Sequence, residues 1–181
     1  MADPLRTASR LLSRVLRHQP ELAGVQLDAA GWVDVDALLA GLARLGHPLT
    51  RAQLDAVVAA NDKQRFGLSP DGQRIRARQG HSVPVQLDYA PATPPPHLWH
   101  GTTTRHLPGI RAQGLVRGQR HHVHLSADPD TARRVGQRHG PPVVLEVDAA
   151  RMHAAGHVFF RTDNGVWLTD AVPPGFLGGL D

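Results

Sequence analysis

Three places in the sequence combine arginine with histidine: residues 17–18, residues 76–82 and residues 120–124. A guanidinium group presents a planar fork of N–H donors that fits phosphate oxygens, and an imidazole exchanges its proton near neutral pH. Arginine beside histidine therefore suits binding of a phosphorylated anion and proton transfer close to it. A single arginine would be weak evidence, but three such sites favour one common use.

Each site also has a structural explanation. Arg17 and His18 close a predicted helix, where cations interact favourably with the C-terminal dipole. Arg76 and Arg78 would share one face of a predicted strand and could form an exposed basic hairpin edge. Sequence alone leaves these alternatives open.

The histidines near residue 122 allow a competing metal hypothesis. On a strand, His122 and His124 would share one face, with His100 as a third imidazole ligand. A metal hydrolase or a cupin-like oxygenase would use such a set. Against it, H-E-x-x-H is absent and glutamate occurs only twice; Asp128 or Asp130 would have to supply the carboxylate. Histidines that simply form hydrogen bonds in a polar cleft are the stronger alternative, and we expect no metal.

Composition excludes several other classes. The 181 residues carry a formal net charge of +4 and contain no cysteine, which excludes disulfide scaffolds, zinc–thiolate sites and thiol nucleophiles. Neither G-x-G-x-x-G after a strand nor G-x-x-x-x-G-K-[ST] occurs, so the sequence supports no Rossmann or Walker nucleotide site. No apolar run is long enough to cross a bilayer, and residues 1–6 do not resemble a secretion signal. We expect a cytoplasmic protein, and a monomer because no heptad pattern indicates an obligate dimer.

The first half of the chain has the outline of a winged helix. Apolar spacing predicts an amphipathic helix over residues 4–19, ending before Pro20. Asp36 and Thr50 are expected to cap two further helices, and Pro70-Asp71-Gly72 is a strong hairpin turn. The remaining predicted elements are strands 25–28 and 32–35, helices 36–45 and 51–60, and hairpin strands 65–68 and 74–77. Folds of this outline often bind nucleic acid.

The second half has a different composition. Residues 83–97 contain five prolines and little periodicity, which predicts an extended connector and a domain boundary. Beyond it the pattern is mostly strand-like, with a tight turn at residues 163–165. Strands are expected at 98–100, 122–125, 143–147, 158–160 and 166–168, and helices at 104–113 and 130–139. This indicates a second, mixed domain dominated by strands.

Six blocks of sequence, in this order, resemble one family, the NAD-dependent RNA 2′-phosphotransferases: "LSRVLRHQPE", "GWVDVDALL", "IRARQGHS", "LWHGTT", "GLVRGQRHHVHLS" and "NGVWLTDAVPP". The resemblance covers most of the chain. One departure is Arg78, where the family more often has asparagine, and this altered charge could tune substrate preference.

The resemblance implies a transferase of tRNA splicing and RNA repair that consumes NAD. An internal RNA 2′-phosphate would attack the nicotinamide-bearing ribose carbon of NAD and expel nicotinamide. The neighbouring hydroxyl of that same NAD-derived ribose would then attack the phosphorus. This step would release 2′-OH RNA and ADP-ribose 1″,2″-cyclic phosphate. The implied fold is α+β, with a winged-helix-like RNA-binding lobe at residues 1–82, the connector at 83–97, and a mixed α/β, ADP-ribosyltransferase-like NAD-binding lobe at 98–181.

Matching the family motifs residue by residue implies three groups of site residues. The catalytic residues are Arg17, His18, Arg76 and Arg120. The NAD-binding residues are His100, Gly101, Thr102 and Ser126. Gln79 and His81 would help to bind the substrate. We expect the arginines to face one phosphorylated ribose in a cleft between the lobes, because a 2′-phosphate beside a phosphodiester is densely negative.

Two other functions stay open. One is an ADP-ribosyltransferase that caps terminal phosphates of DNA or RNA and stops after the first step. The other is a non-enzymatic winged-helix protein that binds nucleic acid and only senses a nucleotide. The fate of an RNA 2′-phosphate in the presence of NAD distinguishes all three.

Overall fold

The computed structural model describes residues 4–60 and 63–180 of the 181-residue chain. The chain divides into two compact units, Met1–Asp88 and Tyr89–Asp181. We call them the N-terminal and C-terminal units and describe each by itself. Their boundary lies within the segment 83–97 that was predicted as a connector. The outermost residues of the two predicted lobes, 1–3 and 181, lie outside the described residues.

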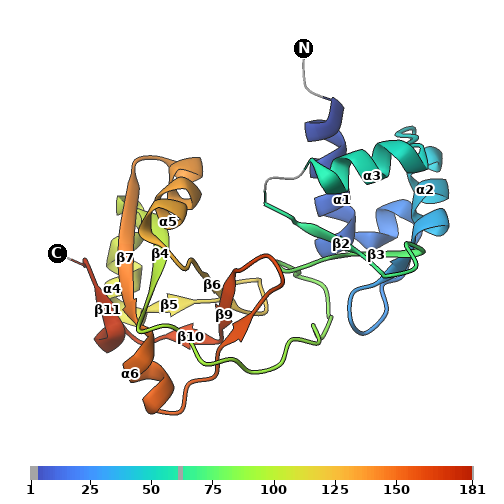
Figure 1. The fold of residues 1–181 in the computed structure, drawn as a ribbon. Coiled ribbons are helices and arrows are strands. Elements are labelled where there is room, and N and C mark those ends of the chain that lie inside the picture. Colours follow the sequence, from blue (N-terminus) through green and yellow to red (C-terminus); the bar gives the residue numbers. More distant parts are fainter. Residues whose placement is uncertain (1–3, 61–62, 181) are drawn as a thin grey trace. The chain divides into compact units, whose positions relative to one another are not determined.

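The N-terminal unit packs three helices against a small antiparallel sheet with strand order β1-β3-β2 (Figure 1). Its elements are α1 (Pro4–Arg17), the 3-10 helix η1 (Pro20–Ala23), β1 (Val33–Asp34), α2 (Val35–Arg44), α3 (Arg51–Ala59), β2 (Phe66–Leu68) and β3 (Arg74–Ala77). The predicted hairpin is confirmed, with Phe66 opposite Ala77 and Leu68 opposite Ile75. Its turn closes through a hydrogen bond of 2.8 Å from Gly72 N to Ser69 O.

Local capping explains where two helices begin. Thr50 caps α3 as predicted. In this capping box Thr50 Oγ1 accepts from Gln53 N, and Gln53 Oε1 accepts from Thr50 N. The expected cap of α2 was wrong: Asp34, not Asp36, accepts from Ala37 N at 2.8 Å, and Asp36 lies in the first turn. A cap must precede the first helical residue with extended backbone, and Asp34 meets that condition with φ −62° and ψ 132°.

The predicted strand at residues 25–28 was also wrong. Asp28 Oδ1 accepts from both Ala30 N and Trp32 N at 2.9 Å and so closes a turn. Such a side-chain bond to nearby backbone competes with strand pairing. The predicted strand at residues 32–35 is reduced to the two residues of β1, because α2 begins at Val35.

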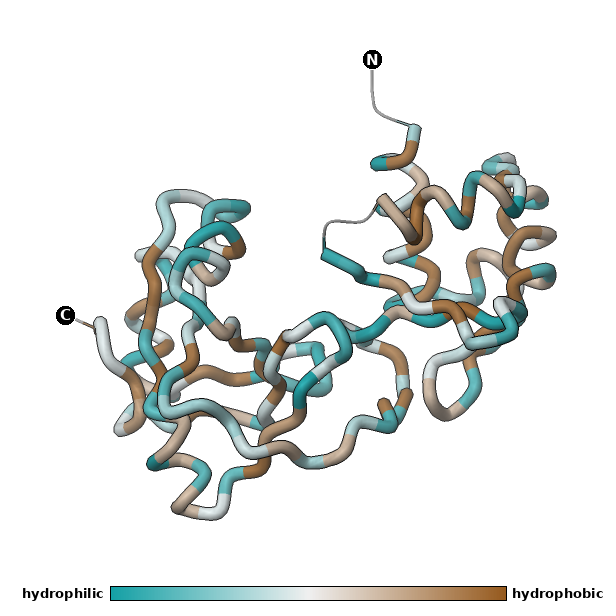
Figure 2. The backbone as a smooth tube through the Cα atoms, viewed as in Figure 1, coloured by the Kyte–Doolittle hydropathy of each residue, from teal (hydrophilic) through white to brown (hydrophobic). Residues whose placement is uncertain are grey.

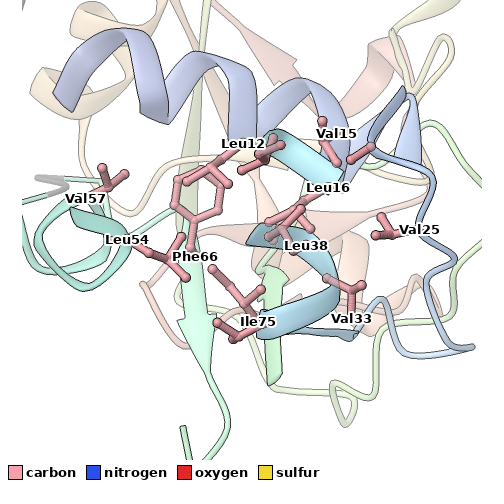
Figure 3. Packing of buried hydrophobic residues seen from close by; sticks show 14 of the residues in the cluster. Leu12, Val15, Leu16, Val25, Val33, Leu38, Leu54, Val57, Phe66 and Ile75 are labelled. Carbon is pink, nitrogen blue, oxygen red and sulfur yellow. The ribbon is translucent and has the colours of Figure 1, made fainter. Parts of the chain in front are cut away.

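A single apolar core holds these elements together (Figure 3). Leu12, Val15 and Leu16 of α1 point into it, where they meet Phe66 and Ile75 from the sheet. In Figure 2 the apolar positions of α1 alternate with hydrophilic ones, as expected for an amphipathic helix. The core therefore fixes α1, and with it the Arg17–His18 end of that helix.

The C-terminal unit is built on antiparallel strands in three small sheets, with orders β11-β7-β4, β6-β9-β8 and β10-β5. Its elements are β4 (His97–Thr103), η2 (Thr104–His106), α4 (Leu107–Gln113), β5 (Leu115–Val116), β6 (Val123–Leu125), α5 (Pro129–Gly136), η3 (Gln137–His139), β7 (Pro142–Asp148), α6 (Ala149–Ala154), β8 (Phe160–Arg161), β9 (Trp167–Thr169), β10 (Ala171–Val172), η4 (Pro174–Phe176) and β11 (Leu177–Gly178). The hairpin turn at 163–165 is confirmed, with Thr162 N bonded to Val166 O at 2.9 Å.

Strand β4 is the central element of this unit. It pairs with β7 along its whole length, from His97 opposite Asp148 to Thr103 opposite Pro142. A reciprocal pair of backbone hydrogen bonds between Trp99 and Ser126, at 2.9 and 2.7 Å, joins β4 to the residue that follows β6. On one face of the strand, Leu98 is fully buried in the second apolar core. His100 follows it on that face.

Helix α5 packs directly against the middle of β4, as Figure 1 shows. A Cβ atom at Gly101 would lie 1.8 Å from the backbone oxygen of Ala132 and 2.8 Å from Gly136 N. No side chain fits in that space, so Gly101 lets the helix and the strand approach each other closely.

The structure confirms a mixed fold of helices and small antiparallel sheets. The predicted helices 104–113 and 130–139 are present, each with one 3-10 turn, before α4 in the first and after α5 in the second. The strand expected at 158–160 was misplaced by two residues, since pairing begins at Phe160. In the described part of the chain, no helix combines the length and apolar character needed to cross a membrane.

Candidate functional site

The end of α1 and the Gln79–Ser82 loop form one side of the candidate site. His18 Nδ1 lies 2.8 Å from Ser82 Oγ, although the two residues are 64 positions apart in sequence. Ser82 N and Val83 N also donate to Arg17 O, at 2.8 and 3.3 Å. These bonds use a carbonyl that the end of a helix leaves without an intrahelical partner. Hydrogen bonds therefore join two of the arginine–histidine sites, the one at residues 17–18 and the one at residues 76–82.

Gly80 lets the loop pass close to the Arg17 side chain. Its φ is +87°, a conformation that residues with a side chain rarely adopt. A Cβ atom there would lie 3.6 Å from Arg17 Cζ, so the guanidinium group lies against the backbone of the loop. Arg17 is half-buried and His18 is exposed, which leaves the imidazole accessible to a substrate.

The same loop buries the His81 side chain and the side-chain oxygen of Gln79. His81 is only 2% exposed and packs close to Gly31, whose Cβ position would be 3.2 Å from His81 Nε2. Gln79 Oε1 is buried and accepts no hydrogen bond from any residue that the structure describes. Leaving a buried acceptor unsatisfied costs about 1–3 kcal/mol. A ligand hydroxyl or amide that donated to this oxygen would recover that cost.

Arg76 is held more firmly than the sequence suggested. It is 7% exposed, and its Nη1 donates to Asp88 Oδ1 at 2.6 Å and to Ala30 O at 3.4 Å. Its Cζ lies 4.5 Å from the centre of the Trp32 ring, within the range of a cation–π contact. The hydrogen bond from Arg76 is the main cause that lowers the pKa of Asp88. The guanidinium group is thus fixed by an acid and an aromatic ring.

Asp88 and Trp32 are residues of this site that sequence reasoning missed. Trp32 stands in the quoted block "GWVDVDALL", which was a usable signal. Nothing in the sequence around Asp88 marks it as the partner of Arg76. The neighbouring Arg78 donates through Nε to Phe66 O at 3.1 Å, across the hairpin. Arg78 is half-buried and supports the hairpin backbone, so it does not form the exposed basic edge that was its structural explanation.

The C-terminal unit brings together Arg120, His124 and His100. Arg120 Nη1 lies 3.4 Å from His124 Nδ1, and His100 Nδ1 lies 3.0 Å from His124 O. A carbonyl oxygen only accepts, so His100 Nδ1 carries the proton and its Nε2 is left with a lone pair. Burial is the main cause that lowers the pKa of His100, so this imidazole is neutral at pH 7.

The other candidate residues of β4 are close to this group in the strand. Thr102 is 7% exposed, and its Oγ1 lies 3.3 Å from His106 Nδ1. Gly101 has the packing role described above, which is a sufficient reason for glycine there. Ser126 is bonded through its backbone to Trp99.

The histidine-rich segment does not assemble in the way the metal hypothesis requires. His122 packs edge-on against the Phe160 ring at 5.5 Å and lies 4.0 Å from Asp170. Burial lowers its pKa. Among residues 4–60 and 63–180, no group of three or more histidine, cysteine or acidic side chains is placed to hold a metal ion.

The candidate residues thus form two chemically different groups. The N-terminal unit holds Arg17, His18, Arg76, Gln79 and His81, and the C-terminal unit holds His100, Gly101, Thr102, Arg120 and Ser126. The first group offers fixed positive charge and an exposed imidazole. The second offers a neutral imidazole with a free lone pair on Nε2, an arginine and hydroxyl groups.

Comparisons with known proteins point to one family. A family model described as "RNA 2'-phosphotransferase, Tpt1 / KptA family" matches residues 3–171. A protein of Burkholderia lata, named "Probable RNA 2'-phosphotransferase", is 62% identical over 174 residues, which cover 96% of this chain and 90% of the relative. Proteins with the same name from Pseudomonas aeruginosa and Hahella chejuensis are 61% and 54% identical. They match 93% and 100% of this chain, and 93% and 97% of their own lengths.

Proposed function

Because the chain belongs to the RNA 2′-phosphotransferase family, we propose that this transferase uses NAD to remove an internal 2′-phosphate from RNA. The products are nicotinamide, 2′-OH RNA and ADP-ribose 1″,2″-cyclic phosphate. The family match confirms the resemblance seen in the six sequence blocks. The observation that carries the proposal is the junction of Arg17–His18 with the Gln79–Ser82 loop.

Arg17, Arg76 and Arg120 provide the positive charge that this substrate requires. A 2′-phosphate next to a phosphodiester repels a second phosphorylated reactant, and guanidinium forks offset that repulsion. Arg76 is anchored by Asp88 and Trp32, so its orientation is set before substrate binds. Fixed donors stabilise charge that develops on phosphoryl oxygens in the transition state more than they stabilise the ground state.

His18 moves the proton in the second step. It is exposed, and the hydrogen bond at 2.8 Å between its Nδ1 and Ser82 Oγ orients the ring. The ribose hydroxyl that attacks the phosphorus must lose a proton and the departing RNA 2′-oxygen must gain one, and an imidazole titrates in the right range for both transfers. Ser82 is therefore a positioning residue for His18.

Several residues of the chain fit NAD as co-substrate. Bound NAD supplies a ribose carbon whose nicotinamide leaves as a neutral group. His100, Thr102 and Ser126 would bind it through a neutral ring nitrogen and two hydroxyl groups, while Gly101 keeps α5 close to that strand. The buried acceptor Gln79 Oε1 fits a ribose hydroxyl or an amide of a ligand. His81 would help to hold that part of the loop in place.

The scarcity of glutamate is consistent with a phosphate nucleophile. A phosphate is already anionic at neutral pH and needs no base to attack the ribose carbon. Only Glu21 and Glu146 occur in the sequence, and Glu146 accepts from His97 Nδ1 at 2.7 Å on the sheet. Arginine in place of a catalytic carboxylate therefore suits this reaction.

The proposal also assigns the two units. Residues 1–82 form a winged-helix-like lobe that binds RNA, residues 83–97 connect it, and residues 98–181 form an ADP-ribosyltransferase-like lobe that binds NAD. Three helices packed on a small antiparallel hairpin sheet support the first assignment. Strands β4 and β7 with α5 against them support the second.

Product analysis tests the proposal. The protein is incubated with NAD and a short RNA that carries one internal 2′-phosphate. The molecular mass of the RNA is then measured by mass spectrometry. Loss of one phosphate from the RNA together with a cyclic ADP-ribose phosphate supports the proposal. A stable ADP-ribosyl adduct on the RNA indicates the alternative enzyme, which stops after the first step. Unchanged RNA that still binds the protein indicates a binding protein.

A further inference from the structure

Helix α1 carries four arginines and no acidic residue in its 14 residues. With about 100° of rotation per residue, Arg6, Arg10, Arg14 and Arg17 fall within an arc of about 80°. The buried residues Ala8, Leu12, Val15 and Leu16 lie on the opposite side. At about 1.5 Å per residue, this arginine stripe runs for about 16 Å and ends at the Arg17–His18 pair.

The stripe is accessible along its length. Arg6, Arg10 and Arg14 are exposed, and Arg17 is half-buried. Arg14 Nε donates to Gln19 Oε1 at 2.6 Å, which orients this side chain without neutralising its charge. Among the described residues, no ion pair joins Arg6 or Arg10 to an acid.

Three other arginines of the N-terminal unit form ion pairs with aspartates. Arg51 pairs with Asp55 at 2.9 Å within α3, and Arg74 lies 3.5 Å from Asp28. Arg76 is paired with Asp88. In a helix-turn-helix the second helix of the motif, here α3, usually contacts nucleic acid. Here α3 carries one arginine and one aspartate, so its charges cancel.

We propose that the exposed face of α1, rather than α3, binds the phosphate backbone of the RNA that flanks the 2′-phosphate. This inference rests on the proposed function, since it places the reacting ribose at Arg17–His18 and the flanking phosphates along Arg14, Arg10 and Arg6. Guanidinium groups in a row bind successive phosphates, and they do so without reading bases. The surface therefore sets affinity for longer RNA and leaves the chemical step unchanged.

The test compares two double variants that each remove two positive charges. R6Q/R10Q alters the stripe, and the matched control R44Q/R51Q alters α2 and α3. Each is assayed with a trinucleotide that carries the 2′-phosphate and with a 15-nucleotide RNA that has the same site at its centre. The expected result is a KM for the long RNA that rises about tenfold in R6Q/R10Q only, with kcat/KM for the trinucleotide unchanged.

Salt dependence gives a second readout. Each phosphate contact to a single strand contributes about 0.7 to the slope of log K against log salt, so R6Q/R10Q should reduce the magnitude of that slope by about 1.4. Flanks of oligo(U) and oligo(A) should give the same result. Equal KM values for R6Q/R10Q and R44Q/R51Q on the long RNA would overturn the inference, as would a larger effect in R44Q/R51Q.

Direct binding separates this inference from the proposed function. Fluorescence anisotropy with the labelled 15-nucleotide RNA needs no turnover. One outcome is that the wild type binds that RNA and R6Q/R10Q loses about tenfold in affinity while no phosphate is transferred. That result supports RNA binding by the arginine stripe and contradicts the proposed function. If phosphate is transferred and both variants bind the RNA as the wild type does, the proposed function stands and the stripe fails.

Discussion

The two units hold their candidate residues by different means. In the N-terminal unit, Arg76 is anchored by the carboxylate of Asp88 and the ring of Trp32. In the C-terminal unit, Arg120 contacts the ring of His124, and the backbone of His124 accepts from His100. The first arrangement keeps a positive charge in a fixed place. The second keeps an imidazole neutral, because burial lowers the pKa of His100.

This difference assigns the two kinds of chemistry. A fixed guanidinium group is suited to bind an anion such as a 2′-phosphate, whereas a neutral ring nitrogen accepts a hydrogen bond from an uncharged hydroxyl or amide. The comparison therefore predicts that the arginines govern the rate of phosphate transfer and that the His100 group governs the binding of NAD.

The largest expected effect comes from removal of an arginine from either unit. Arg17→Ala and Arg120→Ala should each lower kcat by about 100- to 1,000-fold, or about 2.7–4 kcal/mol, because charge on the phosphoryl oxygens loses a fixed donor. Steady-state assays with 2′-phosphorylated RNA measure this. The control Arg51→Ala should change kcat less than twofold. If kcat fell in only one of the two arginine variants, the proposal that arginines of both units govern the rate would be contradicted.

A glycine substitution tests how tightly the C-terminal group is built. Gly101→Ala should destabilise the protein by about 3 kcal/mol, because the added Cβ would lie 1.8 Å from Ala132 O and must displace α5. Gly109→Ala is the matched control, since nothing lies within 4 Å of its Cβ position in α4. That control should be neutral or slightly stabilising. Thermal unfolding of both variants measures the difference, and equal midpoints would contradict the packing role of Gly101.

Removal of the acid that holds Arg76 should have a smaller effect. Asp88→Asn keeps the shape of the side chain but loses its charge, so we expect a several-fold lower kcat/KM. Asp88→Glu keeps the charge and should lower kcat/KM less.

The pKa of Asp88 is lowered in the folded protein, so its ion pair stabilises the fold above about pH 4 and that stability is lost as pH falls. Unfolding midpoints below pH 4 should therefore fall less in Asp88→Asn than in the wild type.

The smallest effect is a change in pH dependence at His100. Its folded pKa is lowered by burial, so the unfolded chain binds more protons below about pH 6.5 and the fold loses stability there. His100→Gln should make the decline in unfolding midpoint between pH 7.5 and 5.5 shallower and raise the KM for NAD. His47→Gln is the control at an exposed position. An identical decline in the two variants would show that His100 is not held neutral.

Local rules predicted the elements whose signals lie within a few residues. Thr50 and Gln53 are close enough in sequence to show the capping box of α3, and the turn at residues 70–72 showed the β2–β3 hairpin. The same rules chose Asp36 over Asp34, because both precede an apolar run and only the backbone conformation distinguishes them. They also missed the two-residue pairing of β5 with β10, whose partners are more than fifty residues apart.

The candidate site was predictable by residue type but not by contact. The blocks around Arg17 and Arg76 were visible in sequence, yet the bond between His18 and Ser82 spans 64 residues and depends on the packing of α1. Asp88 was not found because a single aspartate in a proline-rich segment carries no pattern. Gly101 was expected among the NAD-binding residues, and the structure adds a packing role that sequence could not show, because it depends on the close approach of α5.

The most direct test of the account follows the 2′-phosphate itself. An RNA labelled with ³²P at one internal 2′-phosphate is mixed with the wild type, Arg17→Ala or Arg120→Ala, with and without NAD. The account predicts that the wild type transfers the label from RNA to a small ADP-ribose product only when NAD is present, and that both variants leave it on the RNA. Label released without NAD, or transferred at the wild-type rate by either variant, would contradict it.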